Sequence, residues 1–216
     1  MAGMSELFEL LSAGRLPELG TALTAEPDPA ALRHASGASL LAWAHYVGQP
    51  SAVDILRPFF PTLSPHDAII LGDREALDRA LATGWDANER APDGFTPLGL
   101  AGFFGRREIF DLLLPLTKSL DDAATNPQRV AALHAATARR DAGMVEALLR
   151  AGATPDLTQA GGLTPLHVAA AHGDAAIVGL LLLFGAGRHK TDDQGRDAIA
   201  HARASGWDWL ADRLSA

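Results

Sequence analysis

The sequence feature that most constrains this chain is an internal repeat. A residue that would close a helix recurs along the 216 residues, at Gly14, Gly48, Gly72, Gly105, Arg140, Gly173 and Gly206. The steps between these positions are 34, 24, 33, 35, 33 and 33 residues. Similar apolar spacing surrounds each position, so five of the six steps fit a unit of about 33 residues. Units of this kind stack in a row, and each one contacts its neighbours.

Each unit carries the pattern of two amphipathic helices. In the first helix a leucine is followed three residues later by an alanine, as in Leu166 and Ala169, so that both lie on one face. The second helix has apolar residues at i, i+1, i+4 and i+5, as in Ile177–Leu182. A polar segment such as residues 88–94 then turns the chain into the next unit; we call such a segment a finger. The pattern predicts an all-α solenoid of stacked antiparallel helix pairs with short β-hairpin-like fingers.

The first helix of a unit begins with a recognisable motif. Residues 164–167 read TPLH and residues 96–99 read TPLG. Threonine before proline supplies a helix cap and a backbone angle suited to the first turn. The motif and its period resemble the ankyrin repeat. The resemblance covers nearly the whole chain and implies a single domain, residues 1–216, with repeats 1–33, 34–60, 61–90, 91–124, 125–157, 158–190 and 191–216.

Two of the junctions depart from this pattern. The 24-residue step contains Pro58 and Pro61 and leaves no room for a finger, so we expect the row of fingers to be interrupted between the second and third repeats. The 35-residue step contains residues 117–130 and no GxTP, so we expect an irregular finger there. At the end of the chain, we expect Trp207 and Trp209 to close the core.

The composition excludes several classes of function. The chain has no cysteine, which rules out disulfides and thiolate chemistry. A net charge of -8 opposes general binding to nucleic acids or anionic membranes. The first residues do not read as a secretory signal, and no apolar run is long enough to span a bilayer. We therefore expect a cytoplasmic protein, and the excess of Arg over Lys with abundant Ala suggests a bacterial source.

The eight histidines invite a search for catalysis or metal binding. His134 and His167 occupy the TPLH position, where the resemblance implies a bond to neighbouring backbone. The segment that contains His189, Asp192 and Asp193 would hold a metal only weakly and adventitiously. The sequence contains neither HExxH nor GxSxG nor a phosphate-binding glycine motif. We expect no catalytic residue, no cofactor and no metal, and an enzyme is the least favoured reading.

The resemblance instead implies a protein partner, bound by the fingers and by the ends of the first helices. Aromatic or apolar residues at such surface places favour an interface. Phe95 with one of Phe103 and Phe104 is the main candidate anchor. The same positions in other repeats add Tyr46, Leu163 and His172 as candidates. Arg90, in a finger, is a further candidate. In the second and third repeats, where a finger is missing, the alternative is that such residues seal a neighbouring repeat, and there we favour that alternative.

A group of arginines is the second candidate. Arg106, Arg107, Arg139 and Arg140 fall near the helix turns of two consecutive repeats, where they would form either a patch for acidic groups or an ordinary solvated face. Arg140 is also in place of the usual glycine. Three functions stay open: a general protein-binding module, a dedicated inhibitor or regulator of one enzyme or toxin, and a self-associating scaffold. We expect the first, as a monomer.

Overall fold

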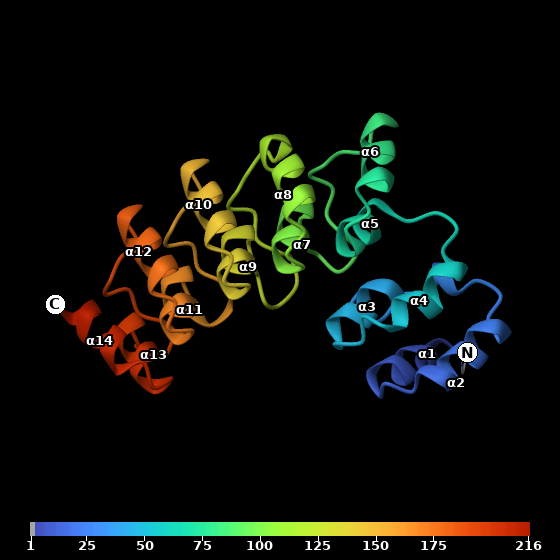
Figure 1. Cartoon of the computed structure of the whole chain (residues 1–216), viewed down its shortest axis with the longest axis horizontal. Helices are drawn as coiled ribbons and strands as arrows, with labels where there is room; N and C mark the ends of the chain where they lie inside the picture. The colour runs from blue at the N-terminus through green and yellow to red at the C-terminus, as the bar shows by residue number, and fades with distance from the viewer. Residues whose placement is uncertain (1–2) are drawn as a thin grey trace. The chain divides into compact units, whose positions relative to one another are not determined.

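A computed structural model describes residues 3–216 of the chain, with side chains described from Glu6 onward. Within these residues the chain forms 14 α-helices and no β-strand beyond an isolated bridge between Arg33 and Ser39. The predicted all-α class is therefore confirmed (Figure 1). The chain divides into two compact units, one reaching to Asp86 and including Arg90–Gly94, the other comprising Ala87–Glu89 and Phe95–Ala216. The single domain expected for residues 1–216 stays a prediction.

The first unit holds three helix pairs. They are α1 (Gly3–Ser12) with α2 (Leu16–Ala25), α3 (Leu40–Tyr46) with α4 (Ala52–Leu56), and α5 (Pro65–Leu71) with α6 (Arg74–Ala82). Helix α3 packs against both α1 and α5, so the pairs follow one another in chain order. Leu11, Leu19, Leu40 and Leu56 are fully buried between them, and these leucines form the core of the first two pairs.

The second unit holds four helix pairs. They are α7 (Pro97–Phe103) with α8 (Arg107–Leu113), α9 (Ala132–Ala138) with α10 (Ala142–Arg150), α11 (Pro165–Ala171) with α12 (Ala175–Leu183), and α13 (Ala198–Ala204) with α14 (Asp208–Ser215). The first helices of successive pairs lie side by side (Figure 1). Small side chains such as Ala136 and Ala169 are fully buried there, which lets neighbouring helices approach closely. Every predicted repeat segment contains one of the seven pairs seen in the described residues.

Side chains at the helix ends explain where the helices begin and stop. Ser39, Ser64, Thr96 and Asp197 each accept a hydrogen bond from the backbone N–H three residues on, which satisfies a free donor of the first turn. Four short 3-10 helices extend or precede the α-helices: Pro29–Ala31, Arg57–Phe59, Leu114–Leu116 and Ala160–Gly162. The repeat register is confirmed by the backbone, because all six predicted glycines and Arg140 adopt positive φ.

The 24-residue step has no finger, as expected. The chain passes from α4 into the 3-10 helix Arg57–Phe59 and reaches α5 at Pro65 without a hairpin. The finger at Ala91–Gly94 belongs to the same unit and lies against the chain before α3. The two segments are so close that a side chain at Gly37 would collide with the carbonyl group of Pro92. The Tyr46 hydroxyl also donates to the Asp93 carboxylate at 2.7 Å. The finger at Ala91–Gly94 therefore packs against the finger at His34–Ala38.

The finger before α9 is irregular, as expected. In the two fingers after it, an N–H bonds to the carbonyl four residues later, from Gln159 to Leu163 and from Asp192 to Arg196. Before α9 the bond runs from Ala124 to Val130, so two more residues are enclosed. Arg129 in this larger loop has a φ of 52°, a left-handed conformation that side chains other than glycine adopt rarely.

The last repeat is closed differently from the prediction. Trp207 and Trp209 are 38% and 48% exposed, and Leu210, Ala211 and Leu214 form the buried side of α14 instead. The Trp207 indole lies over Gly173 and donates to the Ala171 carbonyl at 3.1 Å, so it covers the neighbouring repeat from outside. A tryptophan just before a helix can thus cover the backbone of the neighbouring repeat without entering the core.

Candidate functional site

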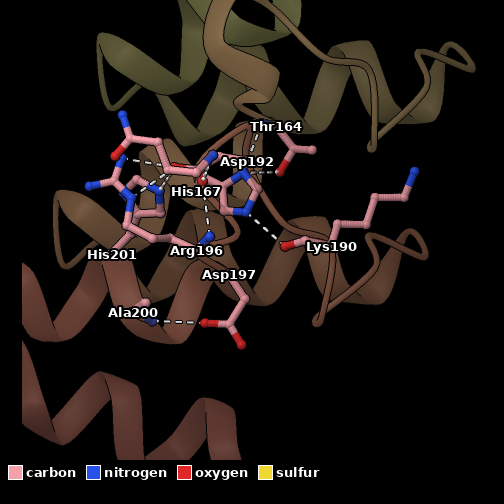
Figure 2. Close-up of polar contacts among 9 residues, drawn as sticks. Thr164, His167, Lys190, Asp192, Arg196, Asp197, Ala200 and His201 are labelled. Atoms are coloured by element: carbon pink, nitrogen blue, oxygen red, sulfur yellow. Dashed lines mark hydrogen bonds and ion pairs between the residues drawn. The ribbon is translucent and has the colours of Figure 1, made fainter.

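The two consensus histidines are structural. His167 Nδ1 accepts a hydrogen bond from the Thr164 N–H at 3.0 Å, and its Nε2 donates to the Lys190 carbonyl of the next finger at 2.8 Å (Figure 2). His134 bonds the Ala131 N–H and the Leu157 carbonyl in the same way. Burial lowers the pKa of both rings, although the bonded carbonyls oppose that change. Because both ring nitrogens hold backbone groups, neither ring is placed for proton transfer to a substrate.

A second polar cluster locks the finger before α13. The buried Asp192 carboxylate accepts from Arg196 at 2.8 Å and from His201 Nε2 at 2.9 Å (Figure 2). Burial opposes ionisation of this carboxyl. The bonds from Arg196, His201 and Gln194 outweigh that effect and hold the pKa of Asp192 well below its usual range. The Asp192 carboxylate is thus fully used in hydrogen bonds to its own finger and to the start of α13. From residue 6 onward, no group of three metal-ligating side chains occurs.

Three phenylalanines gather at one end of α7. The ring centroids of Phe95 and Phe103 are 5.9 Å apart, and those of Phe103 and Phe104 are 5.1 Å apart with the rings nearly perpendicular. Phe95 is only 8% exposed and belongs to the core, so its expected role as an open anchor is wrong. Phe104 is half-buried, and Phe103 is 36% exposed. Phe103 is therefore the aromatic ring that the repeat presents to solvent.

The remaining candidate residues are half-buried, and some of them form hydrogen bonds to neighbouring groups. Tyr46 is half-buried, and burial together with the Asp93 carboxylate raises its pKa far above the ordinary value. Arg90 bonds the Gly94 carbonyl within its own finger at 3.4 Å. Leu163 and His172 are half-buried in the second unit. All four stay candidates for a partner surface, and none of them is as exposed as Phe103.

The four arginines separate into two kinds. Arg107 pairs with Asp111 at 2.8 Å, and Arg140 pairs with Asp174 at 3.3 Å. Arg139 lies instead against Gly105, where an added methyl group would be 2.9 Å from its Nη2. Burial, followed by the charge of Arg139, lowers the pKa of Arg106. Arg139 thus approaches the backbone just after α7.

The outer face of α12 is uncharged, which was not expected from the sequence. The second helices of other repeats carry ion pairs four residues apart, such as Arg74 with Asp78 and Glu146 with Arg150. In α12 the places of Glu146 and Arg150 are taken by Gly179 and Leu183, and Leu183 is 79% exposed. The run Ile177–Ala186 carried the signal, because a surface helix normally has charges on its outer face.

Comparison with known families agrees with this geometry. Two models for ankyrin repeats match the chain, one of three copies over residues 133–214 and one of many copies over residues 66–114. Together they cover more than half of the chain, which belongs to the ankyrin-repeat family. No curated protein matches it. From residue 3 to the end, no helix has the length and apolar character needed to cross a membrane.

Proposed function

We propose that this chain is a non-catalytic module that binds another protein through the end of α7, in the cytoplasm. Ankyrin repeats are in general protein–protein interaction modules. The observation that carries the proposal is Phe103, an exposed aromatic ring at the position just before the left-handed Gly105. Exposed aromatic side chains are enriched in interface centres, where they contribute much of the binding energy.

The surroundings of Phe103 support an interface over a purely structural role. Phe95 below it and Phe104 beside it hold the ring in place, so little conformational entropy is lost when a partner covers it. The consensus histidines and Asp192 use their polar atoms within the fold, which supports a function that needs no chemistry. A monomer that recognises a different protein is the form we expect.

The test compares Phe103→Ser with Leu183→Ser. Both replace an exposed apolar residue of the second unit, but Leu183 lies on the outer face of α12. Wild-type and variant chains are used as bait in extracts of the source cells, and proteins captured by the wild type are identified, purified and titrated by calorimetry. We expect Phe103→Ser to weaken binding about 30-fold or more and Leu183→Ser to leave it unchanged. Equal binding by both variants would refute the proposed site.

A further inference from the structure

A tryptophan in the third repeat occupies a position where two later repeats have a small buried residue. Trp85 follows the left-handed glycine after α6, and Ala153 and Ala186 follow the corresponding glycines after α10 and α12. The backbone is alike in all three places, because each N–H donates to the carbonyl five residues earlier. Ala153 and Ala186 are buried, whereas Trp85 is half-buried. The third repeat therefore has space for an indole ring where these later repeats have only a methyl group.

The space lies beside the chain that takes the place of the missing finger. A cleft of about 490 Å³ lies between the chain that joins α4 to α5, helix α6 and Trp85. In the later repeats, the residue after the alanine bonds to the preceding finger. The Thr154 N–H donates to Asp121 at 2.9 Å, and the Gly187 N–H donates to Asp156 at 2.8 Å. The third repeat has no preceding finger, and its cleft has the size of a ligand site, about 300–1,000 Å³.

The cleft combines apolar side chains with positive charge. Leu63, Pro65 and Trp85 line it as half-buried residues, and Arg57 and Arg79 line it as exposed ones. None of the described residues that line the cleft is an aspartate or a glutamate. In a chain with a net charge of -8, such a cleft attracts an acidic group that most of the surface repels.

Both arginines can take up a carboxylate. Arg57 donates through Nη1 to the Phe60 carbonyl and has no carboxylate partner from residue 6 onward. Arg79 Nη1 lies 3.8 Å from Glu75, and the two side chains are 70% and 92% exposed. Because such an exposed pair contributes little, a carboxylate in the cleft can compete with Glu75 for this arginine. Each guanidinium group can offer paired hydrogen bonds to the incoming carboxylate.

The indole N–H of Trp85 adds a donor that has no acceptor. Its Nε1 is shielded from solvent and forms no hydrogen bond within the part of the chain that the structure describes. A buried donor without an acceptor destabilises the folded state. Because the ring lines the cleft, a small rotation would let this N–H bond to an oxygen that enters the cleft.

We infer that the cleft at Trp85 binds an extended acidic segment of a partner protein, with an apolar side chain against Trp85 and carboxylates at Arg57 and Arg79. Such a segment would replace the missing finger, since the fingers of later repeats are themselves stretches of chain that present an aspartate to the corresponding turn. Charge complementarity directs an acidic segment to this cleft. The site lies in the first unit and goes beyond the proposed function, which depends on Phe103 in the second unit.

Three pools of nonapeptides test the inference by NMR. Each peptide has Leu or Phe at position five and Gly or Ser elsewhere, except that positions four and six hold Asp or Glu in the first pool, Asn or Gln in the second, and Lys or Arg in the third. The chain has four tryptophans, and Trp85→Phe identifies the indole N–H signal of Trp85 in the spectrum of the ¹⁵N-labelled full chain. We expect the acidic pool to shift this signal and to bind about tenfold more tightly than the amide pool. The difference should shrink at about 500 mM salt, because screening weakens exposed charges.

Variants of the lining residues assign the effect to the cleft. Arg79→Gln is expected to weaken binding of the acidic pool about tenfold and to leave the amide pool unchanged, and Arg57→Gln should act in the same way. Arg74→Gln is the matched control, because Arg74 also belongs to α6 but pairs with Asp78 at 2.9 Å and does not line the cleft. Trp85→Ala introduces the residue of the later repeats and should weaken both pools. Thermal melting checks the fold of each variant, and the exposed arginines decide the question if Trp85→Ala unfolds.

Several results would overturn the inference. They are equal binding of the acidic and amide pools, tighter binding of the basic pool, the same shift of the Trp85 signal by inorganic phosphate alone, and no shift at millimolar peptide. The proposed function is judged separately, by whether Phe103→Ser loses the captured partner. Phe103→Ser should leave the response of the Trp85 signal unchanged, and loss of peptide binding in that variant would place the acidic segment outside the cleft.

Discussion

The two units use the same position of the repeat in opposite ways. His167 and Asp67 are each the third residue of a first helix, after Thr164-Pro165 and Ser64-Pro65. His167 reaches forward and donates to the Lys190 carbonyl of the following finger. Asp67 reaches back and accepts from the Ser39 hydroxyl of the preceding repeat at 2.5 Å, and from Ser64 at 2.6 Å.

The difference follows from hydrogen-bond chemistry. A neutral imidazole donates through one nitrogen and accepts through the other, so it can link a helix start to a backbone carbonyl. An ionised carboxylate only accepts, so it must turn to hydroxyl or N–H donors. The first unit lacks the finger before α5, and the serines that cap α3 and α5 supply those donors. A repeat that lacks the histidine can thus still hydrogen-bond to a neighbouring repeat, but to the preceding one instead of the following one.

Removing the carboxylate should have the largest effect on stability. We expect Asp67→Ala to lower the free energy of unfolding by about 3 kcal/mol, because a buried acceptor of two hydroxyl bonds is lost. Urea unfolding followed by circular dichroism measures the change. Asp54→Ala, an exposed aspartate of the same unit, should change stability by less than about 0.5 kcal/mol. A loss no greater than that of the control would show that Asp67 does not link the repeats.

Removing the histidine should have a somewhat smaller effect. We expect His167→Ala to cost about 2 kcal/mol, since the bonds to the Thr164 N–H and the Lys190 carbonyl are both lost but involve a neutral ring. The control is His189→Ala, which alters an exposed residue of the same finger. Unfolding in urea is again the measurement, and unchanged stability together with lost partner binding would instead indicate a functional histidine.

The two units should also differ in their response to mild acid. The pKa values of His134 and His167 are lowered by burial, so the unfolded chain takes up protons more readily than the folded chain. The stability that they contribute is complete above the unfolded value of about 6.5 and falls as the pH falls below it. Asp192 has a lowered pKa too, but its contribution is lost only below about pH 4.

Unfolding midpoints between pH 7.5 and 5 measure this dependence. The double variant His134→Gln with His167→Gln keeps side chains that can bond the helix starts and should flatten the curve in that range. Equal slopes for wild type and double variant would mean that other groups titrate there.

The smallest expected effect is a gain. Arg140 has a φ of 60° where the other repeats have glycine, and a left-handed arginine costs roughly 1 kcal/mol. Its exposed ion pair with Asp174 offsets little of that cost. Arg140→Gly should therefore stabilise the chain by about 0.5–1 kcal/mol in urea unfolding. Arg140→Ala removes the same ion pair but keeps the strained backbone, so a gain in that variant would place the cause elsewhere.

The repeat register could be predicted from the sequence because it depends on local requirements. Helix caps such as Thr96 and turns such as Gly105 restrict the backbone wherever they occur. The missing finger near Pro58 and the irregular finger before α9 followed from chain length alone. The exposure of the side chains did not: Phe95 and Phe103 are both aromatic and eight residues apart, yet only tertiary packing decides which one is buried.

The candidate site was predicted only in outline for the same reason. The four arginines occur as two sequence pairs, Arg106 with Arg107 and Arg139 with Arg140. The structure places Arg139 against Gly105 and pairs Arg107 and Arg140 with carboxylates. That choice depends on rotamers and on the close approach at Gly105. Asp67 was overlooked because its two serine partners, Ser39 and Ser64, are brought together only when α3 packs against α5.

The bond between Tyr46 and Asp93 has a consequence for how this chain can be inherited and rearranged. Repeat arrays gain and lose members by in-register duplication and deletion, which a chain tolerates when each repeat contacts only the next one. Tyr46 belongs to the second repeat and Asp93 to the start of the fourth, so this contact passes over a whole repeat. Deleting the third repeat would remove Asp67 and the residues that hold Gly37 and Pro92 at their present separation. We therefore expect recombination that keeps these contacts to move the second and third repeats together with the finger at Ala91–Gly94.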